Sequence, residues 1–284
     1  AHTGLRHLHS LESTSITGLD LSSNSLRAMP ALAGLPRLRT LSLQGHRIQQ
    51  LNLESLSSLP DLVKLDISSR GGSDVVGPLP TSPLPKLRSL RAKGVDISVK
   101  QLKQLARPES LTELVFGLKP RSNRNSGSFD MSAVCNLLAS DVQQLEIWHL
   151  PVADVELCAN TRFNTLAFRA SSQLTAITTR GSSINFLDVK DSEHLRDIRF
   201  DATTANIPHI DVSGTAFNGW ESACEQLGTQ SFVAKRVSST ATLNDRPFLL
   251  SRMLDRCLES TYLFDFSGTK LSNVAAFESS LRRR

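Results

Sequence analysis

A short frame of apolar residues returns along almost the whole chain and limits the possible folds more than any other feature. Residues 16–24, ITGLDLSSN, show it in full, with apolar first, fourth and sixth positions and Asn at the ninth. Copies lie 21 to 25 residues apart, with one interval of 31. A period of this length predicts a solenoid of stacked coils. The fourth position is always Leu or Ile: Leu19, Leu41, Leu65, Leu90, Leu114, Leu145, Leu166, Leu187 and Ile210.

Each copy centres on a short segment in which apolar and polar residues alternate, as in a β-strand with one buried face. One coil cannot bury its own apolar positions, so the coils must stack and their strands must form a parallel sheet. Between the strands, residues 99–106 predict a helical return and the Gly- and Pro-rich residues 71–86 an extended one. The polar residues 119–130 predict a surface loop. Weak copies of the strand pattern recur at 231–234 and 264–269.

The LxxLxLxxN pattern of residues 16–24 resembles that of the leucine-rich repeat superfamily, and the chain looks like a divergent, extracellular receptor-type member of it. The resemblance implies an α/β horseshoe-shaped solenoid with a concave parallel sheet of about nine to eleven strands and an irregular or short-helical convex side. In that family, the amide of the Asn at the ninth position forms hydrogen bonds with backbone groups of the turn. Here Asn24 matches, and other residues take that place elsewhere: His46, Arg70, Val95, Ser171, Ser192 and Thr215.

The same frame predicts the domain organisation. We expect the solenoid to cover residues 1–216, where the copies are clear. Residues 217–284 are expected to form irregular repeats or a cap that continues the same solenoid.

The four cysteines allow two interpretations. Cys135, Cys224 and Cys257 each lie among apolar residues at helical spacing, which suits free thiols buried as small hydrophobic groups. Alternatively, two disulfides, Cys135–Cys158 and Cys224–Cys257, would indicate an oxidising compartment. The absence of any N-x-S/T acceptor weighs modestly against a heavily glycosylated secreted protein. The spacing does not resemble a zinc site.

Charge and hydropathy restrict the partners. The formal net charge of +5 suits a protein partner with an acidic surface but is no nucleic-acid signature. No run of about 18 apolar residues occurs, so we expect no membrane-spanning segment. The oligomeric state is left open.

Catalytic chemistry finds little support. The sequence holds no GxSxG, P-loop or HExxH pattern, and no cluster of residues that predicts a metal or cofactor site. A carboxylate recurs at one strand position in Asp20, Asp66, Asp188, Asp211 and Asp265. A row of repeated Asp on a sheet face, without a nucleophile, predicts solvated surface carboxylates. We therefore expect neither catalytic residues nor a cofactor.

The strongest candidate for recognition is the concave face around Trp148. This residue alternates with Leu145 and Ile147, so the frame directs it outwards. An exposed aromatic residue flanked by cations has the composition of a binding hot spot. The alternative is that the indole packs onto the neighbouring coil or onto the predicted loop at 119–130. The predicted ligand-binding residues of this face are Trp148, Arg169, Lys93, Arg91, Lys190 and Glu146.

These observations predict a non-enzymatic protein-recognition module. The first interpretation is the ligand-binding ectodomain of a receptor or adhesion protein, located outside the cell or at its surface. The second is an intracellular adaptor or scaffold in the cytoplasm, with four free buried thiols. An enzyme is the third, and no constellation of residues supports it.

Overall fold

The computed structural model describes residues 4–6, 8, 11–117, 129–200 and 207–217, and the backbone of strands at 231–233 and 263–265. The chain divides into two compact units, residues 1–148 and 149–284. The predicted boundary after residue 216 stays a prediction. Cys224, Cys257 and most of the predicted loop at 119–130 lie outside the described residues.

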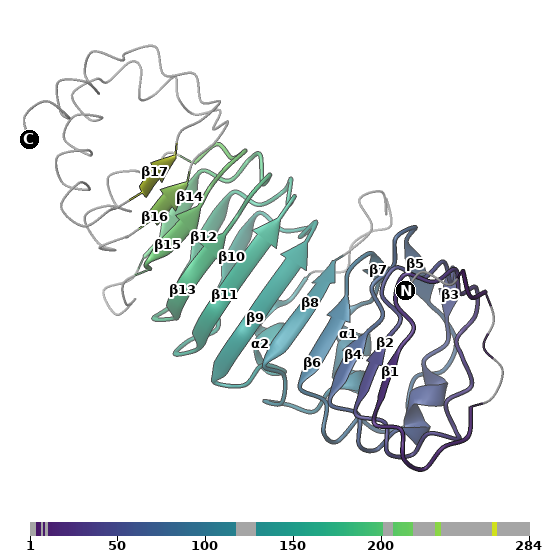
Figure 1. Cartoon of the computed structure of the whole chain (residues 1–284). Coiled ribbons are helices and arrows are strands. Elements are labelled where there is room, and N and C mark those ends of the chain that lie inside the picture. Colours follow the sequence, from purple (N-terminus) through teal and green to yellow (C-terminus); the bar gives the residue numbers. More distant parts are fainter. Residues whose placement is uncertain are drawn as a thin grey trace, which may run out of the picture. The chain divides into compact units, whose positions relative to one another are not determined.

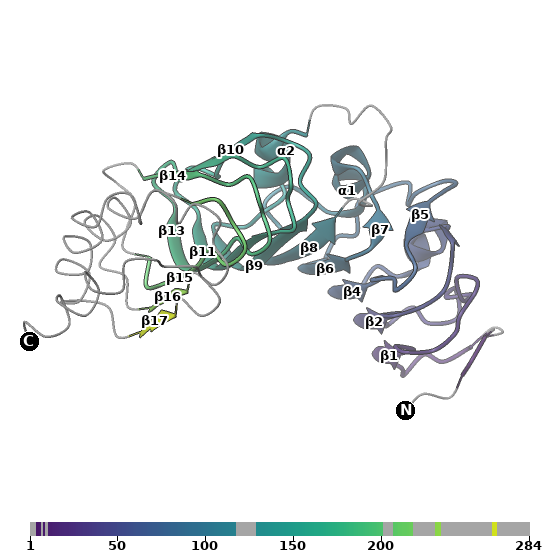
Figure 2. The same ribbon diagram turned by 90° about the horizontal axis from the view of Figure 1, so that it is seen from above.

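The first unit is built on a parallel main sheet, with a smaller outer sheet and short helices in the return segments (Figure 1). The outer sheet contains β3 (Gln50–Leu51), β5 (Ser73–Val75) and β7 (Val95–Asp96), and the helices are η1 (Glu54–Ser58), α1 (Val99–Leu105) and α2 (Met131–Cys135). Figure 2 shows β5, β7 and α1 on the opposite side of the coils from the main-sheet strands. The main sheet has the order β1 (Gly18–Asp20), β2 (Thr40–Ser42), β4 (Lys64–Asp66), β6 (Ser89–Ala92), β8 (Glu113–Gly117) and β9 (Asp141–Trp148).

The described part of the second unit also has a main sheet and an outer sheet. Its outer sheet has the order β10 (Asp154–Glu156), β12 (Ala176–Thr178) and β14 (Asp197–Arg199). Its main sheet has the order β11 (Arg162–Arg169), β13 (Ser183–Asp188), β15 (His209–Asp211), β16 (Ser231–Val233) and β17 (Leu263–Asp265). Among the described residues, the six and five main-sheet strands of the two units match the predicted number of about nine to eleven. The structure confirms the predicted leucine-rich-repeat type of solenoid.

The strand register follows the frame read from the sequence. Leu41 pairs with Leu65, Leu90 with Leu114, and Leu166 with Leu187. Eight of the nine predicted frame residues are buried, and Leu19 is half-buried on β1, the first strand of its sheet. The strands β16 and β17 continue the pattern, with Phe232 opposite Phe264. Coil stacking therefore buries the apolar positions that one coil leaves exposed.

The return segments differ from the prediction in one respect. The predicted helix at 99–106 is present as α1, and it begins with a capping box in which Ser98 and Gln101 bond each other's backbone N–H. The predicted extended return at 71–86 contains β5. The outer sheets, however, were not anticipated. Strands of two or three residues, such as β3 and β10, carry too few residues to show an alternating pattern.

Several substitutes for the ninth-position Asn still satisfy turn backbone. Asn24 donates to the Leu21 carbonyl at 3.2 Å and accepts from the Leu5 N–H at 3.1 Å. His46, fully buried, accepts the Ile48 N–H at Nδ1 (3.0 Å) and donates from Nε2 to the Ile67 carbonyl (3.0 Å).

In the second unit, hydroxyl groups take over this role. The Ser171 hydroxyl accepts the Leu150 N–H at 3.0 Å, and the Ser192 hydroxyl donates to the Phe168 carbonyl at 3.1 Å. Both side chains are fully buried. Hydroxyl groups can thus replace the amide because each can donate and accept.

One disulfide is present among the described residues. Cys135, at the end of α2, and Cys158 form the predicted Cys135–Cys158 bond. For this pair the interpretation as free buried thiols is wrong, and the predicted Cys224–Cys257 bond stays a prediction.

Candidate functional site

The solvent-facing side of the first unit's main sheet carries a continuous chain of polar contacts. The Arg91 guanidinium donates to the Glu113 carboxylate and, at 2.8 Å, to the Gln144 carbonyl oxygen. The Gln144 amide donates to Glu146 at 2.8 Å, and the Trp148 indole N–H donates to the same carboxylate. These contacts link β6, β8 and β9 and hold each side chain in one orientation. We call Arg91, Glu113, Gln144, Glu146 and Trp148, together with Lys93, the Trp148 cluster.

The sequence left open whether Trp148 is exposed or packed, and the structure shows an intermediate arrangement. Trp148 stands on the outward side of β9, as the alternation predicted, but it is half-buried. The Lys93 ammonium lies 3.5 Å from the centroid of its ring, a cation–π contact. The indole is therefore anchored at its N–H and covered by a cation, with part of its surface left accessible.

Gly117 makes room for this tryptophan. It lies opposite Trp148 on the neighbouring strand. A Cβ atom at Gly117 would lie 2.5 Å from the Trp148 Cβ and 2.9 Å from its carbonyl oxygen. Because the backbone of one partner is involved, a larger residue could not be accommodated by side-chain motion alone. Gly117 is thus required for the close approach of β8 and β9 at the candidate site.

A hollow of about 530 Å³ lies on the same side of the main sheet. Its lining comes from β1, β2, β4, β6 and β8, and includes Asp20, Lys64, Asp66, Arg91 and Glu113. Arg91 and Glu113 belong to both the hollow and the Trp148 cluster, so the two are continuous. Both signs of charge line it, and the face is therefore mixed in charge.

The second unit has a separate ionic cluster on its main sheet. Asp188 is fully buried and lies 2.5 Å from the Arg169 guanidinium and 3.8 Å from the Lys190 ammonium. Lys190 also pairs with Asp211 at 2.8 Å. Burial raises the pKa of Asp188, and this effect outweighs the Lys190 N–H and the two cations, which favour the carboxylate. Burial alone would lower the pKa of Lys190, but its bond to Asp211 and the charges of both carboxylates raise it.

The recurring aspartates have a structural explanation. In each of Asp20, Asp66, Asp188 and Asp211 a carboxylate oxygen accepts the backbone N–H two residues further on, at 2.8 to 3.2 Å. This is the Asx-turn geometry, which ends the strand and starts the return. Within the described residues no group of three His, Cys, Asp or Glu side chains is placed to hold a metal ion.

The predicted site residues thus belong to two groups. Lys93, Arg91, Glu146 and Trp148 form one cluster on the first unit, whereas Arg169 and Lys190 form ion pairs on the second. The sequence frame placed them in outward rows but gave no sign of their partners. Glu113 and Gln144, which connect Arg91 to Glu146, were not singled out. Their positions opposite each other in the frame could have indicated them.

Comparisons with known proteins give only distant similarities. No known protein family matches the chain, and no curated protein does. One similar solved structure is the functional domain of InlJ from Listeria monocytogenes, which includes a cysteine ladder (13% identity, TM-score 0.32). It covers 79% of this chain, and this chain spans about half of it, 54%. Another is an internalin, InlF, from Listeria monocytogenes str. 4b F2365 (15% identity, TM-score 0.37; 92% of this chain and 84% of that chain). The helices that the structure describes have five to seven residues, fewer than a helical membrane span requires.

Proposed function

We propose that this chain is a non-enzymatic protein-recognition module that binds its partner on the main sheet of its first unit. The Trp148 cluster, continuous with the 530 Å³ hollow, is the observation that carries the proposal. Aromatic and Arg residues in well-packed surroundings supply most of the energy in protein interfaces. Here Trp148 is held in place before binding, so little conformational entropy is lost when a partner covers it.

The charges of this face narrow the predicted chemistry of the partner. Arg91 is neutralised by Glu113, and the hollow contributes Asp20 and Asp66 beside Lys64. An acidic group on the partner would suit Lys64 and Lys93, and a basic group would suit the aspartates. A partner with both signs of charge therefore fits better than a uniformly acidic one.

The Cys135–Cys158 disulfide favours a place outside the cell or on its surface. Disulfides persist in oxidising compartments and are rare in the cytosol. This supports the ligand-binding ectodomain of a receptor or adhesion protein over an intracellular adaptor, in which both thiols would be free. Lys190 and Arg169 on the second unit would then extend recognition only if their ion pairs with Asp188 and Asp211 opened.

The proposal can be tested by placing a photo-crosslinking amino acid at Gln44, an exposed residue in the turn that follows β2 of the main sheet. The matched control carries it at Lys100, exposed on α1. We expect a partner to be captured from Gln44 and not from Lys100. Capture from Lys100 alone would place recognition on the returns and refute the proposal.

With the captured partner purified, Trp148 can be tested directly. Trp148→Ala should weaken its binding by at least about 2 kcal/mol, about 30-fold. Trp148→Phe keeps a ring under Lys93 but loses the bond to Glu146, and should have a smaller effect. Binding unchanged by Trp148→Ala would refute Trp148 as the anchor. A binding loss matched by global unfolding would show that Trp148 acts in packing.

A further inference from the structure

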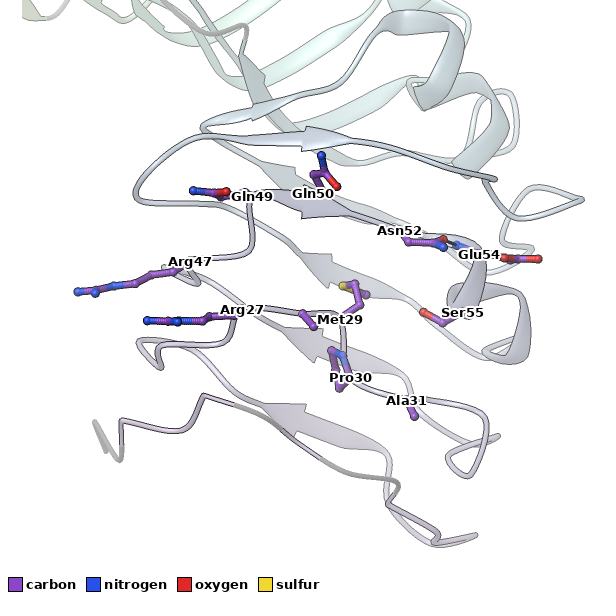
Figure 3. A pocket seen from close by; sticks show the side chains of 11 residues that line it. Arg27, Met29, Pro30, Ala31, Arg47, Gln49, Gln50, Asn52, Glu54 and Ser55 are labelled. Carbon is purple, nitrogen blue, oxygen red and sulfur yellow. Dashed lines mark hydrogen bonds between the residues drawn. The ribbon is translucent and has the colours of Figure 1, made fainter.

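Another hollow of the first unit lies away from the main sheet, beside β3 at the edge of the outer sheet. Its volume is about 1020 Å³, and it lies between residues 27–31 of one coil and residues 47–55 of the next. Figure 3 shows the side chains that line it, with β3 above residues 27–31. We call it the β3 groove.

The backbone of β3 leaves one side open towards this groove. The Asp74 and Val76 N–H groups donate to the carbonyls of Gln49 and Leu51, each at 2.9 Å. Alternate residues of a parallel strand direct their backbone groups to opposite sides. Gln50, which lies between them, therefore directs its N–H and carbonyl away from β5 and into the groove. Among the described residues no strand pairs with this side of β3.

The side chains around this edge are charged in an ordered way. Arg27 and Arg47 extend side by side near the start of β3, and Glu54 lies beyond its other end (Figure 3). Both arginines are exposed, and in the described part of the chain no carboxylate pairs with either. Met29 and Pro30 line the groove between the charged ends.

We propose that the β3 groove binds an extended peptide segment of a partner protein by adding it as a strand to β3. The backbone of Gln50 would supply main-chain hydrogen bonds, which is the general mode of strand addition to an exposed sheet edge. A carboxylate side chain of the peptide would lie beside Arg27 and Arg47, because two adjacent guanidinium groups lack an anion there. A basic side chain would lie beside Glu54 at the other end.

This surface is independent of the proposed recognition face. The groove is lined by returns and by β3, whereas Trp148 lies on β9 of the main sheet. Failure of one proposal therefore leaves the other standing, and Trp148→Ala provides an internal control for peptide binding.

The probe is a labelled octapeptide of alternating Val and Thr with two Asp residues at one end and one Lys at the other. A copy with N-methylated backbone cannot form a ladder and serves as the peptide control. We expect binding by the intact chain, at least about tenfold weaker binding of the N-methylated copy, and slower amide exchange of Gln50 when the first peptide is bound.

Two variants test the protein side. The double variant Arg27→Glu, Arg47→Glu should weaken binding by at least about tenfold, whereas Arg196→Glu, an exposed arginine of the second unit, should not. Gln50→Pro removes the open N–H and leaves the ladder with β5 intact, so it should also weaken binding. If the proline variant does not fold, the double arginine variant and its control Arg196→Glu still test the proposal.

Three outcomes would overturn the proposal. The first is no binding of the octapeptide, and the second is equal binding of its N-methylated copy. The third is concentration-dependent self-association of the chain that Arg27→Glu, Arg47→Glu abolishes, since the groove would then hold a second copy.

Discussion

Replacing His46 should destabilise the first unit and change the way its stability depends on pH. The ring is fully buried and bonds two backbone groups, the Ile48 N–H and the Ile67 carbonyl, which form no other hydrogen bond within the described residues. His46→Ala leaves both groups buried and unsatisfied. At about 1–3 kcal/mol for each such group, we expect a loss of roughly 2–5 kcal/mol in the free energy of unfolding.

The pH dependence follows from the same contacts. Burial lowers the pKa of His46 below its ordinary value of 6.5, although the Ile67 carbonyl and the Asp66 carboxylate oppose this in part. The neutral ring is needed because Nδ1 accepts the Ile48 N–H. A lowered folded-state pKa means that the stabilisation is complete above pH 6.5 and is lost as the pH falls from there towards the folded-state value.

His46→Asn isolates this effect. Asn24 holds the same position in the preceding coil, where its amide bonds backbone groups of the turn and does not titrate. The assay is urea unfolding, followed by tryptophan fluorescence and circular dichroism, at pH values from 5 to 8. Carboxylates titrate alike in both proteins, so the difference between their curves reports on His46. We expect this difference to shrink below pH 6.5. The reasoning would be refuted if the stability of the parent and of His46→Asn changed with pH in parallel. A loss of less than about 1 kcal/mol in the free energy of unfolding of His46→Ala would refute it too.

The remaining predictions concern packing and the disulfide. Leu145→Ala should cost roughly 2–5 kcal/mol in urea unfolding, because it opens a cavity in a stacked core, and a loss near zero would contradict the assigned register. Gly117→Ala should cost about 1–3 kcal/mol and shift Trp148 fluorescence, because its new Cβ meets Trp148 at 2.5 Å; an unchanged spectrum would speak against this contact. Cys158→Ala should lower the free energy of unfolding by roughly 2–4 kcal/mol and make the Cys135 thiol reactive towards Ellman's reagent under denaturing conditions. A Cys135 thiol that already reacts in the unreduced parent protein would contradict the bond.

The repeat frame by itself determined the fold type and the strand register. Apolar residues at its fourth position can be buried only when coils stack in phase, so the pairings of Leu65 with Leu90 and of Leu166 with Leu187 follow from alternation and period. The helix α1 was equally readable, because its capping box and its apolar spacing lie within ten residues. Local patterns sufficed for these features.

Tertiary structure decided everything that depends on residues from different coils. Lys93 and Trp148 meet across 55 positions, and the Gln144 carbonyl oxygen receives the Arg91 guanidinium across 53. The frame fixes the side of the sheet on which such residues stand, but rotamers and coil spacing decide which of them touch. The sequence could therefore direct Trp148 outwards without showing that Lys93 covers it.

The same limit applies to the cysteines and to the outer sheets. The spacing of Cys135 and Cys158 was compatible with free thiols and with a bond, because only the folded returns decide whether the two sulfur atoms meet. A strand as short as β3 is stabilised by the strand stacked on it and carries no pattern of its own. Alternation and period fixed the fold and the side of the sheet on which each residue stands, whereas long-range packing fixed the contacts within the Trp148 cluster.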